Sequence, residues 1–444
     1  MKKLILSLFT LTLSLTALGQ QAGDNFVIKT SEAGKTTEWS LAGDSKNGDI
    51  STIKHKSNQL ILYAKGYEGI EWATYDIDKI ESITFNVFHK GSYVEESAVD
   101  AVKNMGIGTN FGNCTDVVAM WMNMNSNSVT DFEKAWGQEP TTKPMVDFLK
   151  KNGFNSVRIP VTWFQHMKED GTVDEAWMNR IQEIVDYVID NGMYCILNVH
   201  HDTGADDEKV KHWIKADEAN YNENKEKIES LWTQIATRFK NYDQHLLFEG
   251  YNEMLDADNT WNAPKNASSY KGLNGYAQSF VNAVRATGGN NETRNLIINT
   301  YAAANGDDVL NNLAIPTDKI EGHIAVEVHT YAPWDWFAQK GKWDASCSKE
   351  IADMFTRLNS KFISKGIPCI IGEYGTHGSK SVSKTSSASE IQAAADQAAD
   401  IVKQAKAYGV ATFYWMSIFS EKDRTVPQWT LPTVVEAMKK AYNE

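Results

Sequence analysis

From Met105 onward, short apolar runs alternate with longer amphipathic stretches. The eight runs begin at Met105, Asn155, Met193, Leu246, Asn295, Ile324, Ile367 and Val410. Segments with helical spacing of apolar positions lie between them, for example at 174–191, 224–240, 277–287, 352–365 and 388–408, and a last one lies at 432–442. Strands that are apolar throughout and alternate with helices are typical of a parallel sheet covered by helices. Eight such units predict a closed (β/α)₈ barrel rather than an open doubly wound sheet, and no Gly-rich phosphate-binding motif follows the first strand.

The first hundred residues follow a different pattern. Short β-prone runs at 26–30, 59–64 and 82–88 are separated by Gly, Ser, Asp and Lys, and no helical period is visible. They predict a small β-rich N-terminal module over residues 20–98, which leaves residues 99–444 for the barrel domain. Carbohydrate binding and a role as a spacer both stay open for this module.

The N-terminus has the pattern of a secretory signal peptide. Lys2 and Lys3 precede an apolar stretch from Leu4 to Leu15, and small residues follow at 17–19. A signal peptide over residues 1–19 is therefore predicted, because the apolar run is too short to span a bilayer. We expect a secreted protein, extracellular or periplasmic, with no membrane segment.

Composition narrows the class of partner. The net charge of −13 argues against nucleic acid and anionic membranes, and it is compatible with a neutral substrate. The four cysteines show no paired spacing, and Cys195 and Cys369 fall inside apolar runs, so we expect buried free thiols rather than a disulfide framework. A monomer is expected.

Polar residues crowd the predicted C-terminal ends of the strands, where (β/α)₈ barrels carry their chemistry. They come from seven of the eight strands: Asn110 and Asn113 after the first, Arg158 in the second, His200, His201 and Asp202 after the third, Asn252 and Glu253 after the fourth, His329 and Tyr331 after the sixth, Glu373 in the seventh and Trp415 after the eighth. Any one of them could be a buried structural group, but together they predict an active site.

Two of these residues, Glu253 and Glu373, decide the reaction class, because the fourth and seventh strands face each other across a barrel mouth. Carboxyls about 5 Å apart indicate a retaining glycosidase, whereas a wider gap indicates inversion. Arg158 and the Tyr331 hydroxyl are placed to hydrogen-bond Glu373, which predicts an ionised nucleophile. A neighbouring carboxylate and partial burial predict a raised pKa for Glu253 as the acid/base. Asn252 is an amide that can bond a sugar 2-hydroxyl.

Tryptophan is abundant, with 14 residues, and five lie at or just beyond predicted strand ends: Trp163, Trp261, Trp334, Trp336 and Trp415. Flat indole faces can stack on pyranose rings. Packing under a loop is an equal alternative for Trp163, Trp261 and Trp336, while the position of Trp415 favours substrate contact.

At these residues the sequence resembles glycoside hydrolase family 5, the cellulase family, over about residues 100–444. The resemblance rests on one motif per strand in order: NSVRIPVTW from Asn155, ILNVHHD from Ile196, FEGYNE from Phe248, VHTYAPWDW from Val328, IIGEYG from Ile370 and FYWM from Phe413. It implies Glu253 as acid/base and Glu373 as nucleophile. Substrate-binding positions are then Arg158, His200, His201, Asn252, His329, Tyr331, Trp415 and Asn113.

The resemblance also implies a substrate and a mechanism. It points to an endo-β-1,4-glucanase that acts on β-glucan, including xyloglucan or mixed-linkage glucan, by double displacement and without a metal or organic cofactor. A β-mannanase or another β-glycanase is the alternative. Two residues depart from the family pattern, since Thr109 stands where members often have Trp and Met254 where many have Pro. For the loops at 204–222 and 376–389, a place in the wall of the cleft and a place away from it both stay open.

Two rival functions fit these residues less well. A metal-dependent hydrolase would use His200, His201, Asp202 and His329, but adjacent strand residues point to opposite faces, so the first two should not converge on one ion. A non-enzymatic sugar-binding barrel should lack one catalytic carboxylate, and both are present.

Overall fold

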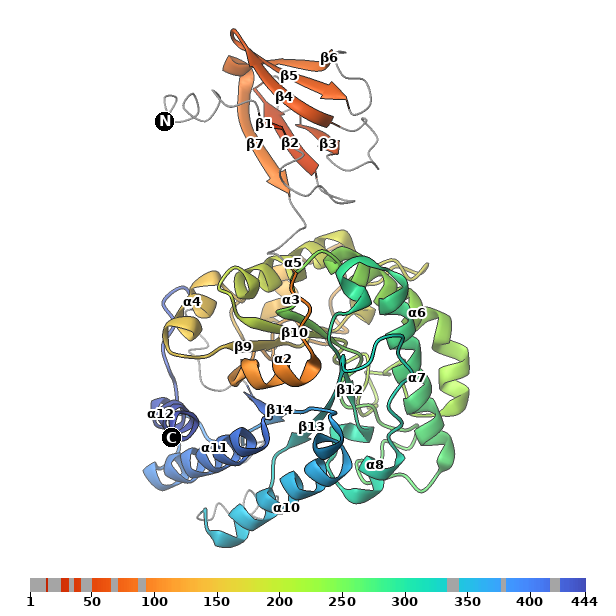
Figure 1. The fold of residues 1–444 in the computed structure, drawn as a ribbon, viewed down its shortest axis with the longest axis vertical. Coiled ribbons are helices and arrows are strands. Elements are labelled where there is room, and N and C mark those ends of the chain that lie inside the picture. Colours follow the sequence, from red (N-terminus) through yellow and green to blue (C-terminus); the bar gives the residue numbers. More distant parts are fainter. Residues whose placement is uncertain are drawn as a thin grey trace. The chain divides into compact units, whose positions relative to one another are not determined.

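The computed structural model describes residues 13–14, 25–31, 36–40, 50–64, 71–86, 93–333, 343–376, 381–415 and 424–444. The chain divides into two compact units, and the division falls between Ser92 and Tyr93. Figure 1 shows the elements of both units.

The second unit is a closed barrel of eight parallel strands that follow one another in chain order. They are β8 (Ile107–Asn110), β9 (Ser156–Ile159), β10 (Tyr194–Asn198), β11 (Leu246–Glu249), β12 (Leu296–Asn299), β13 (Ile324–Thr330), β14 (Cys369–Tyr374) and β15 (Ala411–Tyr414). Pairing of Phe413 with Gly108 closes the ring. Every strand residue is buried, because one side chain points into the barrel and the next toward the helices. The predicted (β/α)₈ barrel is confirmed.

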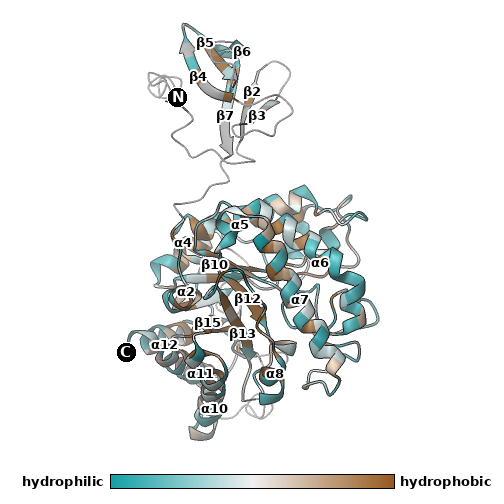
Figure 2. Cartoon of the chain, turned by 45° about the vertical axis from the view of Figure 1, so that its right-hand side comes forward, coloured by the Kyte–Doolittle hydropathy of each residue, from teal (hydrophilic) through white to brown (hydrophobic). Residues whose placement is uncertain are grey.

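Helices alternate with the strands and cover the outside of the barrel. The α-helices are α3 (Val129–Lys134), α4 (Lys143–Lys151), α5 (Glu175–Ile189), α6 (Glu218–Phe239), α7 (Ala267–Ala286), α8 (Asp307–Asn312), α10 (Ala345–Lys361), α11 (Ala388–Tyr408) and α12 (Pro432–Asn443). Short 3₁₀ turns are η3 (Phe164–His166), η4 (Gly289–Glu292), η5 (Tyr301–Ala303) and η6 (Ile363–Lys365). Figure 2 shows the strands as hydrophobic and the outer helix faces as largely hydrophilic.

Three helices, α6, α7 and α10, begin earlier than their apolar period predicts. The side chain of Asp217 accepts hydrogen bonds from backbone N–H groups in the first turn of α6, and Asn266 does the same for α7. Such caps satisfy donors that a helix start leaves unpaired, so they set the first residue. In α6 the buried face begins only at Ile228, whereas in α7 buried residues already occur from Ser269.

A further helix, α2 (Ala98–Met105), was not predicted. Its buried Ala101, Val102 and Met105 pack against inner residues near the strand starts: Tyr194, Ile196, Leu247, Ile297, Ala325, Ile370, Ala411 and Phe413. The helix therefore closes the N-terminal end of the barrel and leaves the C-terminal end for the site.

The residues ahead of α2 belong with the barrel through their hydrogen bonds. The Tyr93 hydroxyl lies 2.8 Å from Thr293 Oγ1. The Glu96 carboxylate accepts from the Tyr194 hydroxyl at 2.9 Å, and the Glu96 carbonyl accepts from Asn295 Nδ2 at 2.9 Å. The division thus falls a few residues before position 98.

The first unit is built from two antiparallel sheets, β1-β4-β5-β6 and β3-β2-β7. Their strands are β1 (Leu13–Ser14), β2 (Asn25–Thr30), β3 (Thr36–Ser40), β4 (Ile50–Lys56), β5 (Gln59–Ala64), β6 (Glu71–Asp76) and β7 (Ile80–Asn86), with the turn η2 (Ile77–Lys79). Ile28 and Trp39 from one sheet share a core with Ile53, Leu60 and Leu62 from the other, as in a small β-sandwich.

The predicted runs correspond to β2, β5 and β7, and β3, β4 and β6 were missed. Of the predicted signal peptide, only Leu13 and Ser14 lie in the described residues, so the signal peptide stays a prediction. In the barrel, Cys195 and Cys369 are buried free thiols, as predicted. Among the helices in the described ranges, none combines the length and apolar content needed to cross a membrane.

Candidate active site

Arg158 of β9 is the centre of a fully buried network at the C-terminal end of the barrel. Its Nη1 donates to Glu373 Oε1 at 2.9 Å and to Asn110 Oδ1 at 3.0 Å. Its Nη2 donates to Asn252 Oδ1 at 2.9 Å. Glu249 of β11 takes the other side of the fork, at 2.7 Å from Nε and 2.8 Å from Nη2. The planar guanidinium therefore fixes two carboxylates and two amides at once.

The charge on Arg158 is retained despite burial. Burial lowers its pKa, but the nearby charges of Glu249 and Glu327 outweigh that effect and hold the pKa well above its usual value. Glu327 lies in β13, with Oε1 3.2 Å from Arg158 Nε. A permanent cation thus lies beneath the rim of the barrel.

Glu373 of β14 is held from two sides. Besides the bond from Arg158, its Oε2 accepts a hydrogen bond from the Tyr331 hydroxyl at 2.7 Å. A shift in the pairing of β13 and β14 between Val328 and His329 brings His329 beside Glu373. Burial raises the pKa of Glu373, and the charges of His329 and Arg158 offset only part of that rise.

Glu253 follows β11 and is the more accessible carboxylate, with 21% of its side chain exposed. Its Oε1 lies 2.8 Å from His329 Nδ1. One carboxylate oxygen of Glu253, one of Glu373 and a ring nitrogen of His329 all lie within 4.8 Å of one another. Burial raises the pKa of Glu253, but the hydrogen bond and positive charge of His329 outweigh burial and hold the pKa below its usual value.

The predicted order of these two pKa values is therefore wrong in this structure. Sequence reasoning placed His329 at the rim but did not foresee its ring between the two glutamates. Burial lowers the pKa of His329, whereas the charge of Glu373 and the hydrogen bonds to Glu253 and Glu327 raise it, to about 10. A protonated imidazole beside Glu253 favours the charged carboxylate there.

His200 and Trp415 lie on another side of the same site. Their rings are nearly parallel, with centroids 5.8 Å apart and an interplanar angle of 10°. His200 Nε2 lies 3.4 Å from Asn252 Nδ2, and Nδ1 lies 3.0 Å from Asn198 Nδ2. Burial holds the pKa of His200 well below its usual value, so the ring is neutral. A Cβ atom at position 112 would lie 2.9 Å from the Trp415 indole, so Gly112 leaves room for the indole.

Three other predicted residues occupy different places. The His201 ring meets His200 edge-on at 4.5 Å, and its Nε2 lies 3.9 Å from Asp116 Oδ2. Asp202 faces away from the site, because its oxygens accept from the Trp163 backbone N–H at 2.8 Å and from Trp213 Nε1 at 2.6 Å. Asn113 is half-buried in the turn after β8, with a left-handed φ of 60°.

The prediction that His200 and His201 point to opposite faces is wrong. β10 ends at Asn198, so strand alternation does not extend to these residues. Ligand atoms of Asp116, His200 and His201 lie within 4.8 Å of one another, as do those of Glu253, His329 and Glu373. Asp202 of the predicted ligand set joins neither group, and in the second group each ring nitrogen of His329 already has a carboxylate partner.

Sequence reasoning missed two buried carboxylates, Glu249 and Glu327. Each stands in a strand that is otherwise apolar, LLFE in β11 and IAVEVHT in β13. A charged residue inside a fully buried strand must be paired, so that signal was available. Asn198, which donates to Glu249 at 3.2 Å, was also missed, although it too is a polar residue in a buried strand.

The family model for cellulase (glycosyl hydrolase family 5) matches residues 114–420. This chain belongs to glycosyl hydrolase family 5. A crystal structure of a glycoside hydrolase family 5 enzyme from Prevotella bryantii B14 shares 56% sequence identity, with a TM-score of 0.76 over 80% of this chain and 100% of that one. Endoglucanase 1 of Ruminococcus albus is 34% identical over 83% of this chain and 88% of its own length. Cellulase/esterase CelE of Acetivibrio thermocellus is 34% identical over 77% of this chain, which spans 40% of that protein.

The resemblance to family 5 is confirmed. The two residues of this family 5 hydrolase that depart from the family pattern, Thr109 and Met254, are both buried. The Thr109 hydroxyl donates to the Tyr414 carbonyl at 3.2 Å, across the seam between β8 and β15. Met254 is fully buried directly after the acid/base candidate. Neither side chain removes a polar group from the network around Arg158.

A cleft of about 400 Å³ opens beside Glu253, between the loops that follow β8, β10 and β11. Large apolar side chains in its lining are exposed, with fractions of 70% for Trp121, 54% for Trp261, 50% for Met120 and 37% for Trp136. Part of the 204–222 loop lines it as well, through Asp207, Lys209 and His212. Trp121 and Trp136 were missed because they lie in the long loop after β8, where the sequence shows neither helical nor strand periodicity.

Of the other predicted tryptophans, one packs beneath the site and two lie outside the described residues. Trp163 is buried and donates through Nε1 to the Asn198 carbonyl at 2.9 Å, so it packs under the site. Trp334 and Trp336 lie outside the described residues, as does part of the 376–389 loop.

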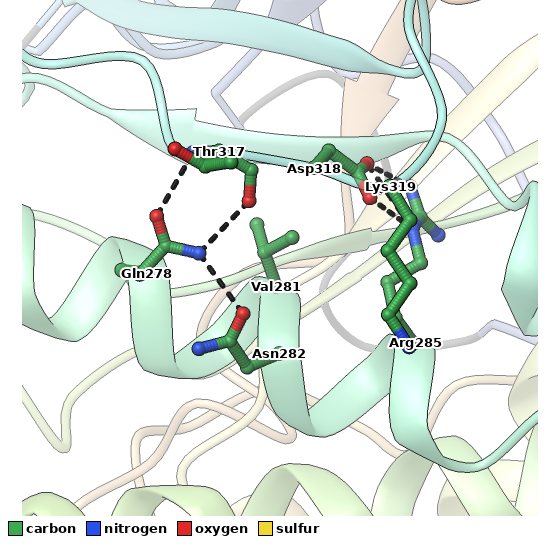
Figure 3. A pocket seen from close by; sticks show the side chains of 7 residues that line it. All are labelled: Gln278, Val281, Asn282, Arg285, Thr317, Asp318 and Lys319. Atoms are coloured by element: carbon green, nitrogen blue, oxygen red, sulfur yellow. Dashed lines mark hydrogen bonds and ion pairs between the residues drawn. The ribbon is translucent and has the colours of Figure 1, made fainter.

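A second pocket, of about 480 Å³, lies against α7 and contains none of the predicted site residues. Figure 3 shows Gln278 bonded to Thr317 and Asn282, and Arg285 paired with Asp318 at 2.7 Å. These contacts tie the segment ahead of β13 to α7, at the N-terminal end of the barrel. Polar groups in this pocket bind one another, which indicates a structural role.

Proposed function

We propose that this family 5 hydrolase is a retaining endo-β-1,4-glucanase, with Glu373 as nucleophile and Glu253 as acid/base. The observation that carries the proposal is the short separation of the two carboxylates, whose oxygens come within 4.8 Å. Retaining enzymes have carboxyls about 5 Å apart, whereas inverting ones need roughly 6.5–9.5 Å to admit a water molecule. Covalent displacement fits this spacing.

The reaction follows from the surroundings of each carboxylate. A Glu373 oxygen attacks the anomeric carbon, the bond to the glycosidic oxygen breaks, and the Glu253 proton goes to that oxygen. Glu253 then takes a proton from water, the water oxygen bonds to the anomeric carbon, and Glu373 leaves with the β configuration restored. Arg158 and Tyr331 keep Glu373 oriented through both steps.

Glu253 must carry a proton in the first step although His329 lowers its pKa in this structure. A sugar ring bound against the cleft would cover the exposed part of Glu253. Removing water from a carboxylate favours its neutral form. Substrate binding thus supplies the protonation that the first step needs.

The relatives support a β-glucan as substrate. One structure of the Prevotella bryantii enzyme is of a variant in complex with a xyloglucan tetradecasaccharide, at 56% identity to this chain. A broad-specificity endoglucanase from an uncultured bacterium is 44% identical. The aromatic cleft beside Glu253 supports binding of a long glucan, and we place the leaving-group sugars there because Glu253 protonates their oxygen. His200, His201, Asn252, Trp415 and Asn113 are proposed to contact the sugar at the bond that breaks.

The predicted signal peptide supports an exported enzyme, since an insoluble or polymeric substrate is reached outside the cell. We propose an export signal over residues 1–19, followed by the β-rich module and, from Tyr93, the barrel domain. No metal or organic cofactor enters the proposed reaction.

A hydrolysis panel tests the proposal. Carboxymethylcellulose, xyloglucan, mixed-linkage β-glucan, xylan and mannan are digested, and chain length and product sizes are followed over time. We expect early loss of viscosity on the β-glucans, and β-configured first products by NMR. Glu373→Gln should abolish hydrolysis, while Glu226→Gln, on the exposed face of α6, should not. First products in the α configuration, or release of one small product from chain ends, would refute the proposal.

A further inference from the structure

One buried carboxylate joins the two cations that contact the glutamate pair. Glu327 Oε1 lies 3.2 Å from Arg158 Nε and 3.3 Å from His329 Nε2. Arg158 in turn contacts Glu373 at 2.9 Å, and His329 contacts Glu253 at 2.8 Å. Glu327 therefore lies one contact away from both members of the pair.

The Glu327 carboxylate occupies the space that a side chain at position 372 of β14 would fill. A Cβ on Gly372 would come within 1.8 Å of Glu327 Oε1 and 2.2 Å of its Cδ. The residue immediately before Glu373 must therefore be glycine while Glu327 occupies this position. The other oxygen, Oε2, is buried and has no hydrogen-bond partner among the described residues. The contacts that join the carboxylate to Arg158 and His329 are made by Oε1.

The His329 ring has a carboxylate at each nitrogen, Glu253 at Nδ1 and Glu327 at Nε2. A neutral imidazole carries one N–H and can donate to only one of them. Both contacts are satisfied by the imidazolium, which donates twice. Burial alone would lower the pKa of His329, and the surrounding carboxylates raise it to about 10.

We propose that Glu327 is a positioning residue that keeps His329 protonated and so controls how readily Glu253 takes up and releases its proton. This inference rests on the proposed function, because it assigns Glu253 the acid/base role. The charged and titratable groups that face this pair come from several elements: Arg158 on β9, Glu249 on β11, Glu253 after β11, Glu373 on β14 and His200 after β10.

Replacing Glu327 by glutamine should release the second proton of His329. The amide of E327Q can donate to Nε2, and Nδ1–H alone then donates to Glu253. Glu253 loses a positive neighbour at 2.8 Å, so it holds its proton up to a higher pH. Glu373 loses the same positive charge at 3.7 Å, so both limbs of the pH profile move in the same direction.

Glu249→Gln is the matched control. Glu249 is also a buried carboxylate that bonds Arg158, at 2.7 and 2.8 Å, but His329 keeps its two carboxylates in this variant. Without the negative charge of Glu249, the positive charge of Arg158 acts more strongly on Glu373. The pKa of Glu373 should therefore fall. The two substitutions remove the same charge from the same arginine and should shift the profile in opposite directions.

The experiment measures kcat and kcat/KM against pH on a soluble β-glucan for wild type, E327Q and E249Q. We expect the E327Q profile to move to higher pH by at least about 0.5 unit, with kcat reduced roughly tenfold. The E249Q profile should move to lower pH. An unshifted E327Q profile, or a shift shared by both variants, overturns the inference.

A second measurement holds even if E327Q does not fold. Nitrogen-15 NMR of the wild-type histidine rings, with His329→Gln to assign the signal, should show His329 protonated at both nitrogens at pH 7–8. A neutral His329 ring at pH 7 overturns the inference. This readout is independent of hydrolysis, so a wild-type protein inactive on β-glucans would refute the proposed function and leave this test intact.

Discussion

The Tyr331 hydroxyl donates to Glu373 Oε2 at 2.7 Å, while Arg158 occupies Oε1. Each oxygen of the proposed nucleophile thus has one strong donor. Because a donor to the charged form favours ionisation, the two bonds oppose the effect of burial on Glu373.

Tyr331→Phe removes the donor to Oε2 and should raise the pKa of Glu373 further. We expect kcat to fall roughly tenfold to a hundredfold, and the acidic limb of the profile to move to higher pH. Rates on a soluble β-glucan across pH check this. Tyr187→Phe is the control, since its hydroxyl also bonds a carboxylate, Glu183, at 2.7 Å but on the outer helix α5. A Tyr331→Phe enzyme with the wild-type profile would contradict the role assigned to this bond.

Arg158→Lys should destabilise the protein as well as inactivate it. One ammonium group cannot replace the five contacts that the guanidinium makes with Glu249, Asn252, Asn110 and Glu373. A buried carboxylate left without its partner costs about 3–5 kcal/mol of unfolding free energy. Urea unfolding measures this loss, and Arg357→Lys, at a half-buried arginine of α10, should cost less than about 1 kcal/mol. Equal losses for both variants would show that the network contributes no special stability.

Trp121→Ala should separate long substrates from short ones. Trp121 is 70% exposed in the cleft beside Glu253, where we place the leaving-group sugars. We expect kcat/KM on β-glucan to fall by up to roughly tenfold, in line with about 0.5–1.5 kcal/mol for a lost aromatic stacking contact. An aryl β-cellobioside, whose leaving group is a single ring, should be cleaved within about twofold of the wild-type rate.

Val99→Ala is the control for that comparison, because Val99 is an exposed apolar residue on α2, at the closed end of the barrel. It should leave both substrates unaffected. Equal losses on the polymer and the aryl glycoside would place Trp121 outside the leaving-group side.

Stability should depend on pH through His329. Its folded pKa of about 10 lies above the value near 6.5 of an unfolded histidine. Such a group contributes stability that is fully present below about pH 6.5 and is lost as pH rises toward 10. The difference in unfolding free energy between wild type and His329→Gln should therefore shrink from pH 6 to pH 10, as measured by urea unfolding at each pH. A constant difference across this range would show that His329 carries no charge in the folded protein.

Local pattern was sufficient for much of the fold. The eight strands are recognisable because each is buried on both sides and reads as a short apolar run, and the 388–408 helix has its observed bounds because its cap and its apolar period coincide. α2 was missed because eight residues give too short a period to detect. The starts of α6, α7 and α10 were missed because capping side chains, rather than apolar spacing, set their first residues.

By itself, the sequence determined the barrel and the ring of polar residues at its C-terminal end, since strand order and strand ends follow from burial patterns along the chain. Only the tertiary structure decided which groups touch. Arg158 contacts Glu373 across 215 residues, a register shift brings His329 beside Glu373, and the end of β10 turns His200 and His201 toward one region. The balance of charge on Glu253 and Glu373 depends on those distances of a few ångströms, because electrostatic interactions inside a protein are strong and fall with separation.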